Sequence, residues 1–138
     1  MKSIWAAGTI AVGLLGMAPP TQAHHSFLVE FNPKQRITLA GVVTKVEWMN
    51  PHTFFYIDVK DEHGQVLSWT LETGTPSQLS VRGWTRESLK EGDHITVTGY
   101  RARNGSNRAA TRQVRLADGR SLLTGRTDGT DYDTPAAK

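Results

Sequence analysis

The sequence predicts an all-β protein with one short helical segment, and three observations support this prediction. Apolar and polar side chains alternate in several short segments, most clearly at residues 53–60. Polar turn sequences such as Asp61-Glu62-His63-Gly64 separate these segments. Only residues 75–83 carry clear helix-start and helix-stop signals. A compact β domain with a helix inserted in its middle therefore fits the pattern.

Three strands are expected in the first half of the domain, at residues 37–48, 53–60 and 65–72. The apolar positions of the first strand change register at Gly41, which indicates a β-bulge at that glycine. Asn50-Pro51 ends the strand. The first strand is thus predicted to be long and bent.

The helical segment follows the third strand. Thr75 is suited to cap a helix that Pro76 begins at its first position. Gly83 is expected to end it, and residues 85–89 to form a further helical turn. This places a short helix between the third and fourth strands.

Two more strands are expected at residues 94–103 and 110–116, followed by a short hairpin at Asp118-Gly119. Three strands, a helix and two strands, with a bulge in a long first strand, is the order of an OB-fold barrel. A β-sandwich is the alternative, but it usually has about seven strands and no central helix. We therefore predict a small OB-like five-stranded barrel with a short helix between strands 3 and 4.

The N-terminal residues have the layout of a secretory signal peptide. Lys2 precedes an apolar run of about twelve residues, and small residues follow before His24. The run is too short to span a membrane. We predict a signal peptide at residues 1–23, a domain at 24–124 and a disordered polar tail at 125–138. The mature protein is then periplasmic, with no transmembrane span after processing.

Composition excludes several classes of function. The 138 residues contain no Cys, which excludes thiol catalysis, disulfides and Cys-based zinc sites. There is no nucleophile elbow, phosphate loop or dinucleotide-binding glycine motif, so a non-enzymatic role is favoured over an enzymatic one. Export argues against a nucleic-acid partner.

Three groups of residues stand out as motifs: His24-His25-Ser26-Phe27, Glu47-Trp48 with Asn50-Pro51-His52, and Gly99-Tyr100-Arg101-Ala102. Together they resemble a bacterial exported family of unknown function with an OB-like fold. The resemblance covers residues 24 to about 123. It implies the fold and the periplasmic compartment, but no reaction, because that family has no assigned activity.

Cleavage after residue 23 would create a possible metal site. His24 would then carry a free α-amine beside its own imidazole, and copper(II) prefers such nitrogen donors. His25 or His52 is the candidate third donor. The alternative is that His24 and His25 form a flexible start and that His52 only stabilises the Asn50-Pro51 turn.

A possible ligand face combines aromatic and basic residues. OB-fold proteins bind ligands by stacking on aromatic rings, and guanidinium groups match carboxylates and phosphates. The candidate residues are Trp48, Phe54, Tyr56, Trp84, Tyr100, Arg101 and Arg103. Each ring is alternatively a core residue, and the arginines a solvated surface.

Three hypotheses of function follow. The first is a non-enzymatic periplasmic module that binds an unknown small molecule. The second is a copper-binding protein that uses His24 with His25 or His52. The third is an adaptor that binds an anionic envelope component through the basic and aromatic face.

Overall fold

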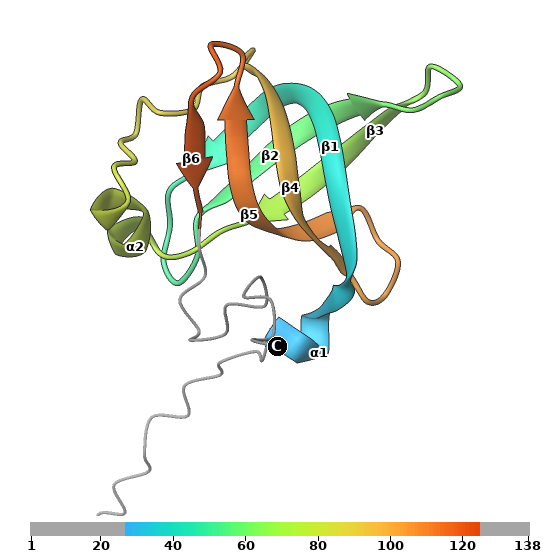
Figure 1. Cartoon of the computed structure of the whole chain (residues 1–138), viewed down its shortest axis with the longest axis horizontal. Coiled ribbons are helices and arrows are strands. Elements are labelled where there is room, and N and C mark those ends of the chain that lie inside the picture. The colour runs from blue at the N-terminus through green and yellow to red at the C-terminus, as the bar shows by residue number, and fades with distance from the viewer. Residues whose placement is uncertain (1–26, 125–138) are drawn as a thin grey trace, which may run out of the picture.

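A computed structural model describes residues 27–124, so the predicted signal peptide, His24, His25 and the predicted tail lie outside the described residues. Two short helices and six strands make up the described chain (Figure 1). In chain order they are α1 (Phe27–Glu30), β1 (Phe31–Glu47), β2 (Phe54–Lys60), β3 (Val66–Glu72), α2 (Pro76–Val81), β4 (His94–Ala102), β5 (Arg108–Leu116) and β6 (Ser121–Leu123).

The strands form a closed ring. β1 pairs antiparallel with both β2 and β4, β2 pairs with β3, and β4 pairs with β5. A short parallel pairing of β3 with β5, in which Thr70 lies opposite Arg108, completes the ring. β6 extends the sheet beyond β5. The all-β prediction is confirmed, and β1 to β5 with α2 between β3 and β4 follow the predicted order, whereas α1 and β6 were not among the five strands and one helix predicted.

β1 is longer and bends differently from the prediction. It begins at Phe31, six residues before the predicted start at residue 37. Pairing with β4 is interrupted between Phe31 and Arg36, so the missing N–H of Pro33 disturbs no regular ladder. The register shift against β2 lies between Val43 and Lys45, so the expected bulge at Gly41 was wrong.

Gly41 has a different role at the bend of β1. A Cβ atom there would lie 2.5 Å from the backbone oxygen of Asp58 in β2. The missing side chain therefore allows the two backbones to approach each other closely.

The helix prediction is confirmed at α2 and wrong for residues 85–89, which form turns only. Thr75 is the N-cap: its hydroxyl accepts the Gln78 N–H at 3.1 Å, and its own N–H donates to the Gln78 side chain at 3.0 Å. Leu79, the buried residue of α2, packs into the main core.

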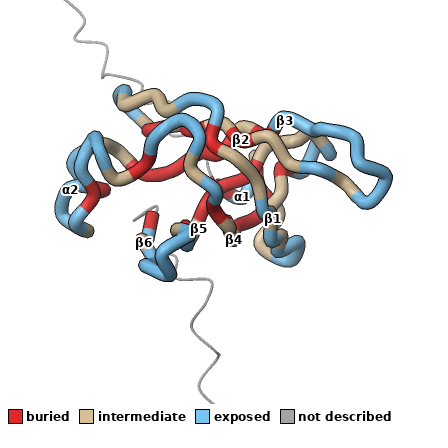
Figure 2. Tube along the Cα trace, turned by 90° about the horizontal axis from the view of Figure 1, so that it is seen from above, coloured by how far each residue is buried: buried red, intermediate tan, exposed pale blue. Residues whose placement is uncertain are grey.

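Two apolar clusters hold the molecule together, and Figure 2 shows their buried segments between exposed loops. The main cluster lies inside the ring and includes Phe55, Ile57, Leu71 and Val97. A second cluster lies where α1 meets the strands. It consists of Phe27, Phe31, Tyr100, Ala102 and Ala110. α1 thus covers a part of the strand surface that the main core does not use.

Candidate functional site

A buried carboxylate lies at the end of β3. Glu72 is only 3% exposed, and its Oε1 is 2.6 Å from Nδ1 of His52. His52 belongs to the loop between β1 and β2 and follows the cis peptide bond Asn50–Pro51. The Nδ1–H group donates to the carboxylate, which fixes the orientation of the imidazole ring.

A second cation approaches the same carboxylate from β5. The guanidinium of Arg108 lies 3.4 Å from Oε2 of Glu72 and 4.0 Å from Oε2 of Glu30 in α1. The parallel pairing of β3 with β5 places Arg108 opposite Thr70, two residues before Glu72. Because residues two apart share one side of a strand, both charged side chains lie on the same surface. We call His52, Glu72, Arg108 and Glu30 the Glu72 cluster.

Burial makes the Glu72 cluster energetically significant. A buried carboxylate is strongly unfavourable unless donors compensate it, and here two charged or chargeable donors do so. Neither Glu72 nor Arg108 was among the predicted site residues. The only local signal was an acidic residue directly after the apolar Leu71, at the end of a strand.

The His52 ring presents its other nitrogen away from Glu72. The side chain is 28% exposed, and Nε2 forms no hydrogen bond or ion pair with another residue of the described chain. A neutral imidazole whose Nδ1–H is bound to a carboxylate carries a free electron pair at Nε2. His52 is therefore oriented as a proton acceptor or a metal ligand.

A second polar group lies on neighbouring β1 and β2. The Tyr56 hydroxyl donates to Oε2 of Glu47 at 2.7 Å, and the Lys45 ammonium forms an ion pair with Oε1 of the same residue. The hydrogen bond to Glu47 is the main cause that raises the pKa of Tyr56, and the charge of Arg108 opposes it. Hydrogen bonds from Lys45 and then Tyr56 lower the pKa of Glu47.

The predicted aromatic face is divided between the surface and the interior. Trp84 and Tyr100 are 4% and 1% exposed, so they are core residues rather than parts of an accessible face. Trp84 donates from Nε1 to the Leu123 carbonyl at 2.9 Å, and Tyr100 packs edge-on against Phe27. α1 covers Tyr100, which the alternation within β4 does not reveal.

The other three rings of that set are partly buried, and Trp48 packs against the main core. Phe54 and Tyr56 project from β2 on the side opposite the main core, and the His52 ring lies 6.5 Å from that of Phe54. Trp48 follows β1, with the Arg86 guanidinium 5.9 Å from its ring centre. Phe54 and Tyr56 therefore lie beside the Glu72 cluster, whereas Trp48 has a separate cationic neighbour.

The two predicted arginines make local contacts. Arg101 lies over the Trp69 ring at 5.3 Å and donates to the Gly105 carbonyl at 2.9 Å. Arg103 donates from Nε to the Leu28 carbonyl at 2.7 Å, which ties the end of β4 to α1. Both arginines thus stabilise contacts within the described chain.

No complete metal site lies within residues 27–124. In that part of the chain, no group of three or more His, Asp or Glu residues is arranged to hold a metal ion. Of the predicted ligands only His52 is described, since His24 and His25 lie outside. Likewise, none of the helices in residues 27–124 is long and apolar enough to cross a bilayer.

The fold and site define an all-β protein with a closed ring of strands and a buried carboxylate cluster at one edge. The model of a family of unknown function (DUF6152) matches residues 11–112, and the chain belongs to this family. Searches of curated proteins and of solved structures gave no significant match.

Proposed function

We propose that the protein is a non-enzymatic periplasmic binding module with an OB-like barrel, and that it binds its ligand at the Glu72 cluster. The OB-like assignment is supported by the strand order in the ring, the parallel β3–β5 closure and the helix between β3 and β4. Periplasmic export rests on the signal-peptide pattern of residues 1–23.

The observation that carries the proposal is the hydrogen bond between Glu72 and Nδ1 of His52. Metal-binding histidines usually donate their second ring N–H to a carboxylate, which orients the ring and makes the ligating nitrogen more basic. Here the carboxylate is buried and held from the other side by Arg108. Such an arrangement prepares His52 for a ligand at Nε2.

Copper(II) is the ligand that the donor set favours. The processed chain would offer the α-amine and imidazole of His24, and His52 would supply a third nitrogen. His24 precedes Phe27 by three residues, a span of at most about 11 Å. Phe27 opens α1, whose Glu30 reaches Arg108 of the cluster. His25 is the alternative third donor.

The test is a copper(II) titration of protein recovered from a periplasmic extract, with its N-terminus determined by mass spectrometry. We expect one equivalent of tight binding and an electron paramagnetic resonance spectrum of a tetragonal site with nitrogen ligands. His52→Ala and His24→Ala should each weaken affinity at least tenfold. His63→Ala is the matched control, because His63 is exposed in the β2–β3 loop.

Two results would overturn the copper assignment. One is unchanged affinity in His24→Ala, which would show that the imidazole of His24 is not a ligand. The other is equal loss in His52→Ala and His63→Ala, which would indicate non-specific binding to exposed imidazoles. If His52→Ala keeps full affinity while His24→Ala loses it, His25 replaces His52 as the third donor.

The envelope-adaptor alternative gains no specific support from the described residues. Two of its aromatic residues, Trp84 and Tyr100, lie in the interior. Its two arginines are bound to Gly105 and Leu28 carbonyls. We therefore place the proposed binding at the Glu72 cluster.

A further inference from the structure

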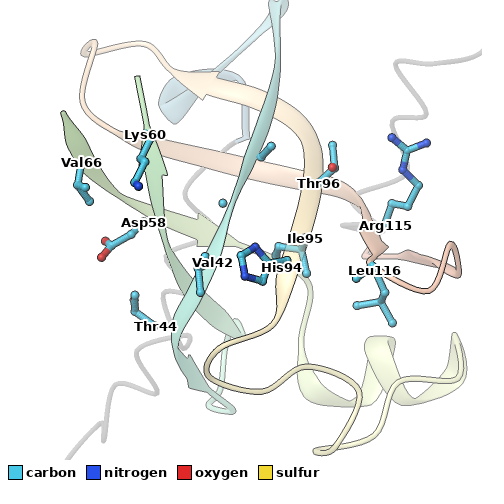
Figure 3. Close-up of a pocket in the computed structure, with 13 residues that line it drawn as sticks. Val42, Thr44, Asp58, Lys60, Val66, His94, Ile95, Thr96, Arg115 and Leu116 are labelled. Atoms are coloured by element: carbon cyan, nitrogen blue, oxygen red, sulfur yellow. The ribbon is translucent and has the colours of Figure 1, made fainter. Parts of the chain in front are cut away.

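A groove of about 710 Å³ lies on the outer side of the strands, at the bend of β1. It shares no residue with the Glu72 cluster. Figure 3 shows Lys60 and Val66 on one side of β1, and Arg115 and Leu116 on the other. Its volume is within the range of pockets that bind small molecules.

Small apolar residues at the bend of β1 form the floor of the groove. These residues are Ala40, Gly41 and Val42. A side chain at Gly41 would collide with the backbone of Asp58 in β2. Val66, which is 55% exposed, forms one wall, and Leu116 forms the opposite wall. Apolar surface thus remains in contact with water, and an apolar ligand covering it would be favoured.

The charges around the groove are predominantly positive. Lys60 and Arg115 are exposed, and neither forms an ion pair with another residue of the described chain. The one carboxylate at the groove, that of Asp58, accepts a hydrogen bond from the Ser68 hydroxyl at 2.6 Å. Two unpaired cations therefore border an apolar floor.

We propose that this groove binds a single-chain anionic amphiphile, such as a medium-chain fatty acid. The hydrocarbon chain lies along Ala40 and Val42, between Val66 and Leu116. The carboxylate meets Lys60 at one end or Arg115 at the other. A monomeric ligand is favoured over a bilayer surface, because the apolar residues line a recess instead of projecting from the molecule.

Isothermal titration with dodecanoate, below the concentration at which it forms micelles, tests the proposal. We expect saturable one-to-one binding to the full chain. The double variant Lys60→Gln/Arg115→Gln should weaken it about tenfold or more, since hydrogen bonds to charged groups are lost. Ala40→Leu should weaken it by filling the floor. Lys34→Gln is the control and should have no effect, because Lys34 is an exposed lysine of β1 that lies outside the groove.

Dodecyltrimethylammonium has the same tail with a positive head group and should bind at least tenfold more weakly. Equal binding of the two amphiphiles, or no effect of the double variant, would overturn the proposal. So would sedimentation with anionic vesicles that depends on Lys60 and Arg115 without binding of dodecanoate. Copper binding at the Glu72 cluster is measured separately, so the two proposals succeed or fail independently.

Discussion

Replacement of Glu72 by Gln removes the charge of the buried carboxylate and preserves its shape. The amide oxygen can still accept one hydrogen bond, from either His52 or Arg108. The amide NH₂ group must then face either Arg108, a second donor, or His52, whose Nδ1 can accept only after its proton moves to Nε2. The variant therefore tests whether the cluster depends on a negative charge at this position.

The cost can be worked out from the contacts of Glu72. A hydrogen bond to a charged group contributes about 1 kcal/mol more than a neutral one, which applies to the His52 bond at 2.6 Å. The Arg108 contact contributes less, because that side chain is 41% exposed and screened by water. Two donors that face each other, or the change of the His52 tautomer that avoids this, add about 1–2 kcal/mol. We expect a total loss of roughly 2–3 kcal/mol in the free energy of unfolding.

Urea unfolding at pH 7, followed by tryptophan fluorescence and circular dichroism, measures this loss. Calorimetry should show Tm lowered by about 10–20 °C for a domain of this size. Glu62→Gln is the matched control, because Glu62 also pairs with a histidine, His63, but both side chains are highly exposed. A change in Glu72→Gln no larger than that in Glu62→Gln would refute the reasoning. If the copper proposal holds, Glu72→Gln should also lower copper affinity about 10- to 100-fold.

Three further predictions concern the fold and the Tyr56 site. Gly99→Ala should cost roughly 3 kcal/mol in urea unfolding, because its Cβ would lie 2.2 Å from the Ala110 carbonyl oxygen; a loss below 1 kcal/mol would contradict the close packing of β4 on β5. Leu79→Ala should cost about 2–5 kcal/mol, since the side chain is fully buried. Glu47→Gln should lower the pKa of Tyr56, measured by ¹³C NMR of the phenol ring, because the hydrogen bond to Glu47 raises it. The contribution of that bond to stability is present below about pH 10 and is lost as the pH rises through the raised pKa of Tyr56.

Local patterns in the sequence predicted most of the strands. The alternation at residues 53–60 matches β2, with Phe55 and Ile57 buried. Thr75 and Pro76 predicted the start of α2 correctly, because a capping box depends only on neighbouring residues. Elements that depend on distant contacts were predicted less well, as the shifted bulge of β1 shows.

The candidate site could be predicted only in part, for the same reason. His52 was identified because it follows a turn-forming Asn-Pro pair. Glu72 and Arg108 lie 20 and 56 residues further along the chain, and the β2–β3 and β3–β5 pairings bring them together. The sequence left open whether Tyr100 belongs to a ligand face or to the core, because strand alternation does not reveal that α1 covers the outer side of β4.

The β3–β5 pairing also has a consequence for the growing or truncated chain. β3 obtains its second neighbour only from a segment that begins 36 residues after Glu72, at Arg108. A chain that stops before Arg108 would expose the hydrogen-bonding groups of β3 along an open edge, which another chain can pair with. Such fragments are therefore expected to aggregate, whereas in the full-length chain β5 covers this edge at residues 70–72.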